Sequence, residues 1–330
     1  MSDRIVVAQP IDADIVEGLS RLGPVRMNPG PEPFSPGALA EACAGAEALM
    51  AFMTERIDAP FLDACPRLRI VAGAFKGFDN VDLAACAERG VTATIVPDLL
   101  TAPTAELALG LMIAVARNIG PGDRQVRSGG FHGWRPRHFG GSLDGATVGV
   151  IGAGRVGRAL LRLLAGFDCT RLYHDKRLLS AEEATALAVR HAEPSELIAE
   201  ADFTVLAVPL TPETTGMVDT AFLSAMKPGS YLVNVARGSL VVEAAVAAAL
   251  ESGQLAGFAS DVFEMEDWAR ADRPAAVHPA LLASERTVFT PHLGSAVIRV
   301  RREIARSAAD SIVQALSGQQ PETGITAAAR

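Results

Sequence analysis

Three closely spaced glycines, Gly152, Gly154 and Gly157, directly follow the apolar run 147–151, and Asp175 stands at the end of a second short expected strand, 170–174. In a βαβ unit the first glycine of such a set permits a tight turn, and the second lets the backbone approach a pyrophosphate. The third lets the helix lie close on its strand, and the acid accepts hydrogen bonds from ribose hydroxyls. The spacing therefore predicts a dinucleotide site, with the phosphates at the N-terminus of the following helix.

Three polar residues stand just after later expected strands. Arg237 follows 233–236, Glu266 follows 261–265, and His292 lies in the segment Thr-Pro-His-Leu-Gly. Residues beyond the carboxyl ends of parallel strands face the ligand crevice. An arginine there can grip an anion with its planar fork, and a histidine can move a proton near neutral pH. A neighbouring carboxylate can orient the ring, so the three residues predict acid–base chemistry on an anion.

Each of the three residues also has a plain structural explanation. Arg237 could cap a helix or form a surface ion pair, Glu266 lies in a charged run, and His292 could be a loop residue bonded to backbone. Their shared position at strand ends, downstream of a dinucleotide motif, favours catalysis.

The elements that must position these residues alternate between strands and helices along nearly the whole chain, which predicts an α/β fold. We expect two doubly wound parallel-sheet (Rossmann-like) domains with a cleft between them. Residues 1–100 plus 296–330 would form a substrate (catalytic) domain, and the dinucleotide-binding domain, 101–295, would be inserted in it. Residues 317–330 are polar and small, and we expect them to be loosely ordered. The expected strands are 5–8, 48–52, 70–74, 92–96, 147–151, 170–174, 204–208, 230–235, 258–261 and 287–289; the expected helices include 12–22, 36–44, 60–64, 81–89, 103–117 and 297–316.

Composition limits the possible partners. The 330 residues carry a net charge of −8, which argues against nucleic-acid binding. The four cysteines lack CxxC spacing, so they are expected to be reduced thiols of a cytoplasmic protein, and no metal site is predicted. No signal peptide is recognised, and the apolar stretch 102–116 is short for a membrane span. These features predict a cytoplasmic protein that binds neither nucleic acid nor a membrane.

In combination, the segments GAGRVG, VNVARG, DVFEMED and TPHLG resemble those of the D-2-hydroxyacid dehydrogenases. The resemblance covers nearly the whole chain. It implies Arg237 as anion binder, His292 as acid–base group and Glu266 as its partner. It also implies a homodimer, formed through the cofactor domain and the helix 103–117. The residues that it implies at the cofactor are Arg155 and Val156 at the pyrophosphate, and Ala207, Val208, Pro209, Val235, Ala236 and Asp261 near the nicotinamide.

The segments 72–82, 96–101 and 261–274 closely resemble one branch of that family, the phosphite (phosphonate) dehydrogenases. That branch oxidises phosphite with water as nucleophile and NAD as hydride acceptor. The resemblance implies that Lys76 and Arg237 clamp the anion, since two cations suit a divalent oxyanion. An isolated lysine more often points to solvent. Residues implied as close neighbours of the substrate are Met53, Gly77 and Ser295.

Two positions depart from a related pattern. Phe139 stands where the phosphite enzymes are expected to have tyrosine, and Asp267 stands where hydroxyacid dehydrogenases often have proline. The second departure fits the phosphite branch. The alternatives that remain are a glyoxylate or hydroxypyruvate reductase and, outside enzymes, an NAD-sensing, corepressor-like scaffold.

Cofactor choice rests on three adjacent residues. Asp175 should bond the ribose hydroxyls and repel a 2′-phosphate, which favours NAD. Lys176 and Arg177 follow it and could pair with a 2′-phosphate, or could simply be solvated. We therefore expect NAD to be preferred and NADP to be usable.

Overall fold

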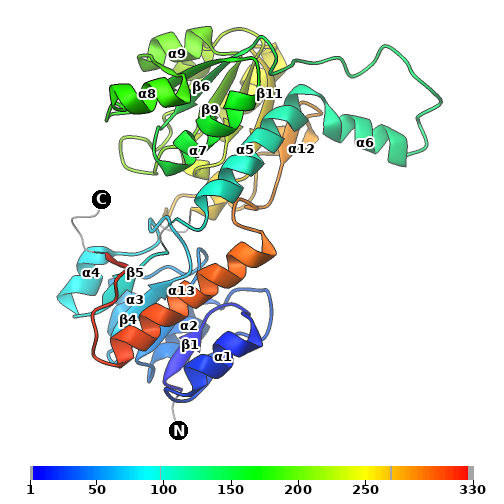
Figure 1. Cartoon of the computed structure of the whole chain (residues 1–330). Helices are drawn as coiled ribbons and strands as arrows, with labels where there is room; N and C mark the ends of the chain where they lie inside the picture. Colours follow the sequence, from blue (N-terminus) through cyan, green and yellow to red (C-terminus); the bar gives the residue numbers. More distant parts are fainter. Residues whose placement is uncertain (1–2, 97, 268–269, 326–330) are drawn as a thin grey trace. The chain divides into compact units, whose positions relative to one another are not determined.

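The computed structural model describes residues 3–96, 98–267 and 270–325 (Figure 1). The chain divides into two compact units. Of the described residues, the first unit takes those within Met1–Leu100, Trp268–Ala271 and Ala296–Arg330, and the second takes those within Thr101–Asp267 and Asp272–Ser295. None of the described helices is long and apolar enough to cross a membrane.

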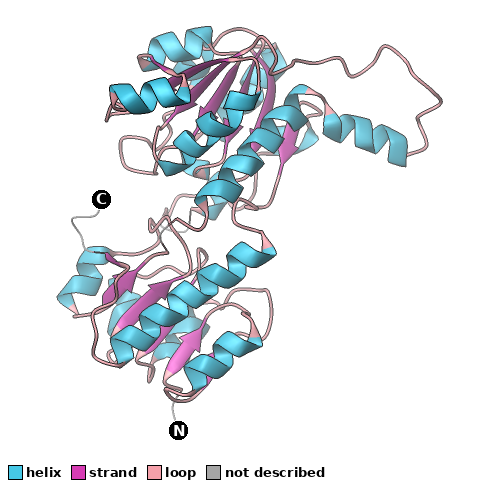
Figure 2. Ribbon diagram, viewed as in Figure 1, coloured by secondary structure: helices cyan, strands magenta, loops and turns pink. Residues whose placement is uncertain are grey.

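The first unit is built on a six-stranded sheet in the order β13-β5-β4-β3-β1-β2. All its described pairings are parallel except that of β13 with β5. The order of β1 to β5 is that of a flavodoxin-like doubly wound sheet. Helix α13 packs on β3 and β4 with α1 at its side (Figures 1 and 2). The elements are β1 (Ile5–Val7), α1 (Ala13–Ser20), β2 (Val25–Met27), α2 (Pro36–Cys43), β3 (Ala48–Ala51), α3 (Ala59–Ala64), β4 (Ile70–Gly73), α4 (Leu83–Glu88), β5 (Thr92–Thr94), α13 (Ile298–Leu316) and β13 (Gly324–Ile325).

The central strands of this sheet are short, continuous apolar runs. Every residue of β3 and β4 is buried, as expected for parallel strands covered on both faces. The helices α2, α3 and α4 each begin at a side-chain cap. Ser35, Asp58 and Asp82 accept a hydrogen bond from a backbone N–H of the first turn. The apolar runs therefore determine the central strands of this unit, and the capping residues determine where its helices begin.

The second unit is built on a seven-stranded parallel sheet in the order β12-β11-β10-β9-β6-β7-β8. This is the Rossmann order with one added edge strand. The direction of winding reverses at β6, which lies between β7 and β9, so ligands are expected beyond the carboxyl ends of these strands. The strands are β6 (Thr147–Ile151), β7 (Thr170–His174), β8 (Arg190–His191), β9 (Phe203–Leu206), β10 (Ser230–Asn234), β11 (Leu255–Ser260) and β12 (Thr287–Phe289).

Helices and short 3-10 turns connect these strands (Figure 2). The long helix α5 is apolar on most sides and packs on α7, β10 and β11. The helices and turns are α5 (Thr101–Ala116), α6 (Ile119–Arg127), α7 (Arg155–Leu163), η1 (Leu164–Gly166), α8 (Ala181–Leu187), α9 (Pro194–Glu200), α10 (Thr220–Ala225), η2 (Gly238–Leu240), α11 (Glu243–Ser252), η3 (Glu264–Glu266) and α12 (Pro279–Ala283).

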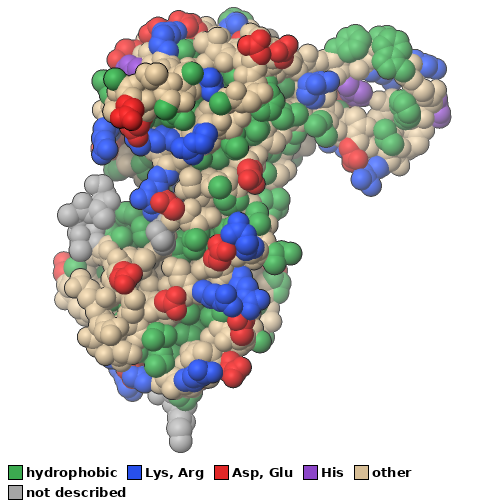
Figure 3. Space-filling view, in the orientation of Figure 1, with side chains coloured by type: hydrophobic (Ala, Val, Ile, Leu, Met, Phe, Trp, Pro, Cys, Tyr) green, Lys and Arg blue, Asp and Glu red, His purple; other side chains and the backbone are tan. Residues whose placement is uncertain are grey.

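An extended arm leaves the second unit after α6 (Figures 1 and 3). Its described residues, 128–142, form no helix or strand, and its large apolar side chains are exposed. Trp134 is 76% exposed and Phe139 is 74% exposed, and Phe131 is exposed as well. Figure 3 shows apolar side chains gathered on this arm.

The fold class expected from the sequence is confirmed, with differences at the sheet edges. The strands β2 and β8 were not among the expected elements, and the loosely ordered tail was a wrong expectation for Gly324 and Ile325, which pair antiparallel with β5. The strands β2 and β8 each carry an exposed arginine and have no continuous apolar run. Their pairing partners, rather than their own sequence pattern, make them strands.

Candidate active site

The three glycines after β6 meet three different steric demands. Gly152 has a φ of +103°, and a Cβ there would lie 2.5 Å from the carbonyl oxygen of Ala207. A Cβ on Gly157 would overlap the carbonyl of Gly152, so helix α7 can lie this close only with glycine there. A Cβ on Gly154 would have no neighbour within 4 Å. The second glycine therefore faces open space, as required where a pyrophosphate approaches the backbone.

Helix α7 begins at Arg155, and its N-cap residue Gly154 has no side chain that could cap it. The first backbone N–H groups of a helix have no intrahelical partner and favour an anion. Val156 is the next residue of this first turn. The helix start and the glycine turn together fit the phosphates of a dinucleotide.

Asp175, directly after β7, is fixed against the glycine turn. Its Oδ2 atom accepts a hydrogen bond of 2.7 Å from Ala153 N–H, and its Oδ1 atom accepts one of 2.9 Å from Arg177 N–H. The side chains of Lys176 and Arg177 are exposed. This places the carboxylate and two cations where a Rossmann sheet binds the adenosine ribose.

A loop after β9 faces the same region. The pKa of Glu213 is held below its ordinary value, mainly by a hydrogen bond from the Thr211 side chain and also by the charge of Lys176. A Cβ on Gly152 would contact both Ala207 and Val208. The segment from Ala207 to Pro209 therefore lies against the glycine turn, where it is expected to border the cofactor.

The imidazole of His292 lies within hydrogen-bonding distance of the Glu266 carboxylate. Nδ1 lies 2.7 Å from Oε2 of Glu266, and Oε1 of the same carboxylate accepts a 2.8 Å hydrogen bond from Phe263 N–H. The His292 side chain is 25% exposed. When Nδ1 donates to the carboxylate, Nε2 of the neutral ring is an acceptor available for proton exchange.

The backbone of His292 adopts an unusual conformation. Its φ is +56°, in the left-handed region that residues other than glycine rarely occupy. His292 N–H donates to the carbonyl of Asp261 over 2.9 Å. Such conformations persist where the surroundings hold them, and they cluster at functional sites.

Asp261 organises the loop that holds His292. The residue is 1% exposed, and its carboxylate accepts hydrogen bonds from the Thr290 hydroxyl (2.5 Å), Leu293 N–H (2.6 Å) and Gly294 N–H (2.8 Å). Burial raises the pKa of this carboxyl, and the hydrogen bonds act in the opposite direction. Its expected place beside the nicotinamide stays a prediction, while its contacts show a structural role in this loop.

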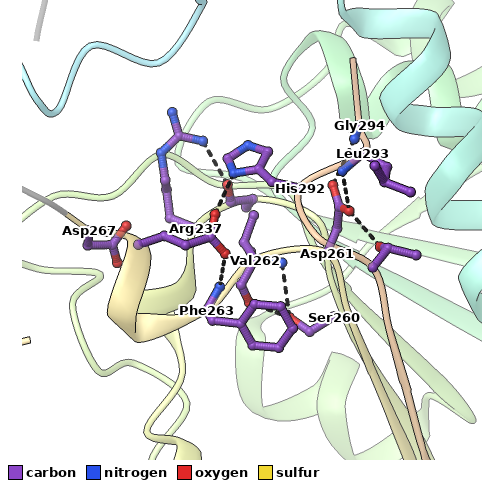
Figure 4. Close-up of polar contacts among 12 residues, drawn as sticks. Arg237, Ser260, Asp261, Val262, Phe263, Asp267, His292, Leu293 and Gly294 are labelled. Atoms are coloured by element: carbon purple, nitrogen blue, oxygen red, sulfur yellow. Dashed lines mark hydrogen bonds and ion pairs between the residues drawn. The ribbon is translucent and has the colours of Figure 1, made fainter. Parts of the chain in front are cut away.

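Arg237 follows β10 through the segment Val235-Ala236. The Asn234 side chain donates a 2.8 Å hydrogen bond to the carbonyl of Arg237, and Nη1 of Arg237 donates to the carbonyl of Ala236 over 2.8 Å. Figure 4 shows the guanidinium of Arg237 and the ring of His292 close together. A fixed cation beside an imidazole–carboxylate pair can bind an oxyanion and exchange a proton with it.

The other residues implied at the substrate lie elsewhere in the chain. Met53 follows β3 and Lys76 and Gly77 follow β4, all in the first unit and all partly exposed. Ser295 is buried at the end of the second unit. Their roles at the substrate stay predictions.

Two buried acids were not singled out as site residues from the sequence. Asp267 accepts a 2.6 Å hydrogen bond from Ser239 N–H, and Glu243 accepts from the N–H groups of Glu264 and His278. Because these contacts span 21 to 35 residues, no local pattern reveals them. The sequence distinguishes Asp267 only as standing where hydroxyacid dehydrogenases often have proline.

Comparison with known proteins identifies the family of this chain. Residues 109–294 match the family model described as "D-isomer specific 2-hydroxyacid dehydrogenase, NAD binding domain". A glyoxylate reductase of Pyrococcus furiosus is 38% identical over 86% of this chain and 84% of its own length. The TT0316 protein of Thermus thermophilus is similar in structure, with a TM-score of 0.88, 33% identity, and 98% of this chain and 100% of that chain covered.

A second solved structure bears on the cofactor. The NADPH-dependent glyoxylate/hydroxypyruvate reductase of Sinorhizobium meliloti, in complex with NADP and malonate, has a TM-score of 0.82 and 28% identity, with 98% of this chain and 97% of that chain covered. The second unit here is an NAD(P)-binding Rossmann domain of an oxidoreductase, and the chain belongs to the D-isomer specific 2-hydroxyacid dehydrogenase family.

Proposed function

We propose that this enzyme oxidises phosphite to phosphate by transferring hydride to a nicotinamide cofactor. The observation that carries the chemistry is the 2.7 Å contact of His292 Nδ1 with Glu266, beside the guanidinium of Arg237. It supports acid–base catalysis on a bound oxyanion. The choice of phosphite rests on Lys76 and on the three segments that resemble the phosphite branch.

Glu266 and His292 have different roles in the proposed reaction. Glu266, fixed by Phe263 N–H, orients the imidazole and stabilises its protonated form. Nε2 of His292 then takes a proton from the water that attacks phosphorus. The hydrogen of the P–H bond leaves with its electron pair, so that water and phosphite give phosphate, one proton and one hydride.

Arg237 and Lys76 are the residues proposed to bind the anion. Arg237 presents a planar fork that matches two oxygens of a tetrahedral oxyanion. Lys76, from the first unit, is proposed to supply the second charge that a divalent anion requires. When bound on the glycine turn and Asp175, NAD or NADP supplies the hydride acceptor.

The second candidate is a glyoxylate or hydroxypyruvate reductase. The printed names of the relatives favour it more directly than phosphite, since the Pyrococcus protein is a glyoxylate reductase and the Sinorhizobium protein acts on glyoxylate or hydroxypyruvate. At the same site Arg237 would hold a carboxylate, and His292 would give a proton to the carbonyl oxygen. Relatives that share a fold and reaction class can still differ in substrate.

One pair of assays separates the candidates and the scaffold alternative. Purified protein is mixed with NAD and phosphite, and in parallel with glyoxylate or hydroxypyruvate and NADH or NADPH, while absorbance of the reduced cofactor is followed. Formation of NADH with phosphite supports the proposal. Turnover with the keto acids alone supports the second candidate, and cofactor binding without turnover in either assay supports a scaffold.

We also propose that the chain forms a homodimer through the second unit. The exposed side chains of Phe131, Trp134 and Phe139 support an apolar contact surface on the arm. A second copy would bury them, since large apolar patches on a monomer mark interaction sites. Light scattering coupled to gel filtration would give the mass of a dimer for the wild type. A Trp134→Ser, Phe139→Ser variant should shift toward the monomer mass, and an unchanged dimer would reject the arm as the contact.

A further inference from the structure

Two short turns carry Arg237 and Glu266, and they lie against each other. Arg237 immediately precedes η2, which follows β10, and Glu266 ends η3, which follows β11. The two strands are neighbours in the sheet, with Asn234 paired to Ser260. The spacing between the proposed anion binder and the proposed acid–base pair therefore depends on how the two turns pack.

The contact between the turns is backbone against backbone. A Cβ on Gly238 would overlap the backbone carbonyl of Phe263 and the N–H of Glu264. No side chain of any size can be inserted there without separating the turns. Hydrogen bonds at the edge of this backbone contact also join the two turns.

Asp267 supplies one of these bonds. Its Oδ2 atom accepts the N–H of Ser239 over 2.6 Å, and the two residues are 3% and 1% exposed. A buried N–H that loses its acceptor is costly, because no water replaces the lost partner.

Glu243 makes a second link at the start of α11. Its backbone N–H donates to Glu264 Oε1 over 2.9 Å, and its own Oε1 accepts Glu264 N–H over 3.1 Å. Its Oε2 accepts His278 N–H over 2.6 Å. Burial raises the pKa of Glu243, and the hydrogen bonds oppose this shift. The η2–α11 segment is thus joined to η3 at two places.

We propose that Asp267 is a positioning residue, whose carboxylate fixes the distance between Arg237 and the Glu266–His292 pair and so determines how tightly the anion is held. The inference rests on the proposed function, because it assumes that these three residues act on one anion. Proline at this position could not accept the Ser239 N–H through its side chain. A chain with proline must therefore hold the two turns differently.

The experiment compares Asp267→Ala, Asp267→Asn and a matched control, Asp144→Ala, an exposed acid of the same unit. The asparagine side chain keeps an oxygen that can accept the Ser239 N–H. Alanine removes this acceptor. With the substrate on which the wild type turns over, Asp267→Ala should raise the KM for the anion about tenfold and leave the KM for NAD within about twofold. Asp267→Asn should recover most of the loss, and Asp144→Ala should match the wild type.

The outcomes separate this inference from the proposed function. An unchanged anion KM in Asp267→Ala, or equal losses for the anion and NAD, would overturn the positioning role while wild-type turnover stands. If Asp267→Ala does not fold, the Asp267→Asn variant decides: equal changes in the KM for the anion and the KM for NAD would also overturn the positioning role. Absence of turnover by the wild type with every anion would reject the proposed function instead.

Discussion

Nδ1 of His292 lies 2.7 Å from Oε2 of Glu266, while Oε1 of that carboxylate accepts the N–H of Phe263. The Glu266 carboxylate is thus held by a backbone N–H of its own turn as well as by the imidazole ring. Because the left-handed backbone of His292 is held by Asp261, both members of the pair are positioned by the second unit itself.

This relationship predicts the effect of Glu266→Gln. The amide keeps the shape and one acceptor but cannot stabilise a protonated imidazole, so kcat should fall by about 10² to 10³ with a small change in KM. His292→Asn should lose at least as much. Steady-state kinetics at saturating cofactor test this, and a Glu266→Gln variant with wild-type kcat would contradict the role given to the pair.

The glycine turn predicts three different outcomes for one substitution. Gly152→Ala should destabilise the second unit by about 1–3 kcal/mol, because alanine is strained at a φ of +103° and would meet the Ala207 carbonyl. Gly157→Ala should also destabilise it, through overlap with Gly152. Gly154→Ala should stay within about 1 kcal/mol of the wild type, since its Cβ meets nothing, but should weaken binding of NAD.

Thermal unfolding with and without NAD measures these differences. The control is the wild type, which NAD should stabilise by mass action. Full stabilisation of Gly154→Ala by NAD would show that the open side of this glycine does not face the cofactor.

The residues after β7 predict relaxed cofactor choice. NAD should be preferred, because Asp175 repels a 2′-phosphate, but by less than about a thousandfold in kcat/KM, roughly 4 kcal/mol. Lys176→Ala should lower kcat/KM for NADP more than for NAD. Steady-state kinetics with NAD and with NADP test this prediction. A preference for NAD of more than about a thousandfold, or an equal effect of Lys176→Ala on kcat/KM for the two cofactors, would show that Lys176 does not face the 2′ position.

The pKa values of two acids in the first unit, Glu55 and Glu47, are shifted in opposite directions, so the two residues should change the free energy of unfolding with pH in opposite senses. Burial raises the pKa of Glu55, which is 3% exposed, against hydrogen bonds from Thr54 and Phe52. The folded state then holds a proton that the unfolded state has lost, so this contribution is present below the unfolded pKa and is lost as pH rises through the folded pKa. The unfolding free energy of Glu55→Gln, relative to the wild type, should increase from about pH 4 to about pH 8.

Glu47 is the matched control with the opposite sign. A hydrogen bond from Arg4 lowers its pKa, so its contribution is present above the unfolded pKa and is lost as pH falls through the folded pKa. Relative to the wild type, Glu47→Gln should therefore become less stable as pH rises from acid. Urea unfolding at a series of pH values gives both differences, and parallel trends in the two variants would contradict the assignment.

Much of this architecture follows from short-range sequence signals. The buried runs of β3, β4 and β6 were expected as strands from their apolar sequence. The site residues were predicted from their position shortly after expected strands, and their roles stay predictions. The contact of His292 with Glu266 follows from their place at adjacent strand ends. These features depend on the order of residues along the chain.

What the sequence did not reveal depends on partners far along the chain. The edge strands β2, β8 and β13 have two or three residues each and become strands by pairing with a neighbour. Asp267 becomes a structural acceptor only because Ser239 N–H, 28 residues earlier, is buried beside it. The loop around His292 is likewise fixed by Asp261, which the family resemblance implied only as a neighbour of the cofactor.

The central claim, hydride transfer from phosphorus at the Arg237–Glu266–His292 site, is tested most directly with deuterium-labelled phosphite. The enzyme is incubated with NAD and this substrate, and the reduced cofactor is analysed by mass spectrometry, with His292→Asn as the control. We predict that one deuterium per turnover appears in the reduced nicotinamide and that the control forms almost none. Unreduced NAD under these conditions, together with reduction of glyoxylate by the same preparation, would contradict phosphite as the substrate and leave a 2-hydroxyacid dehydrogenase.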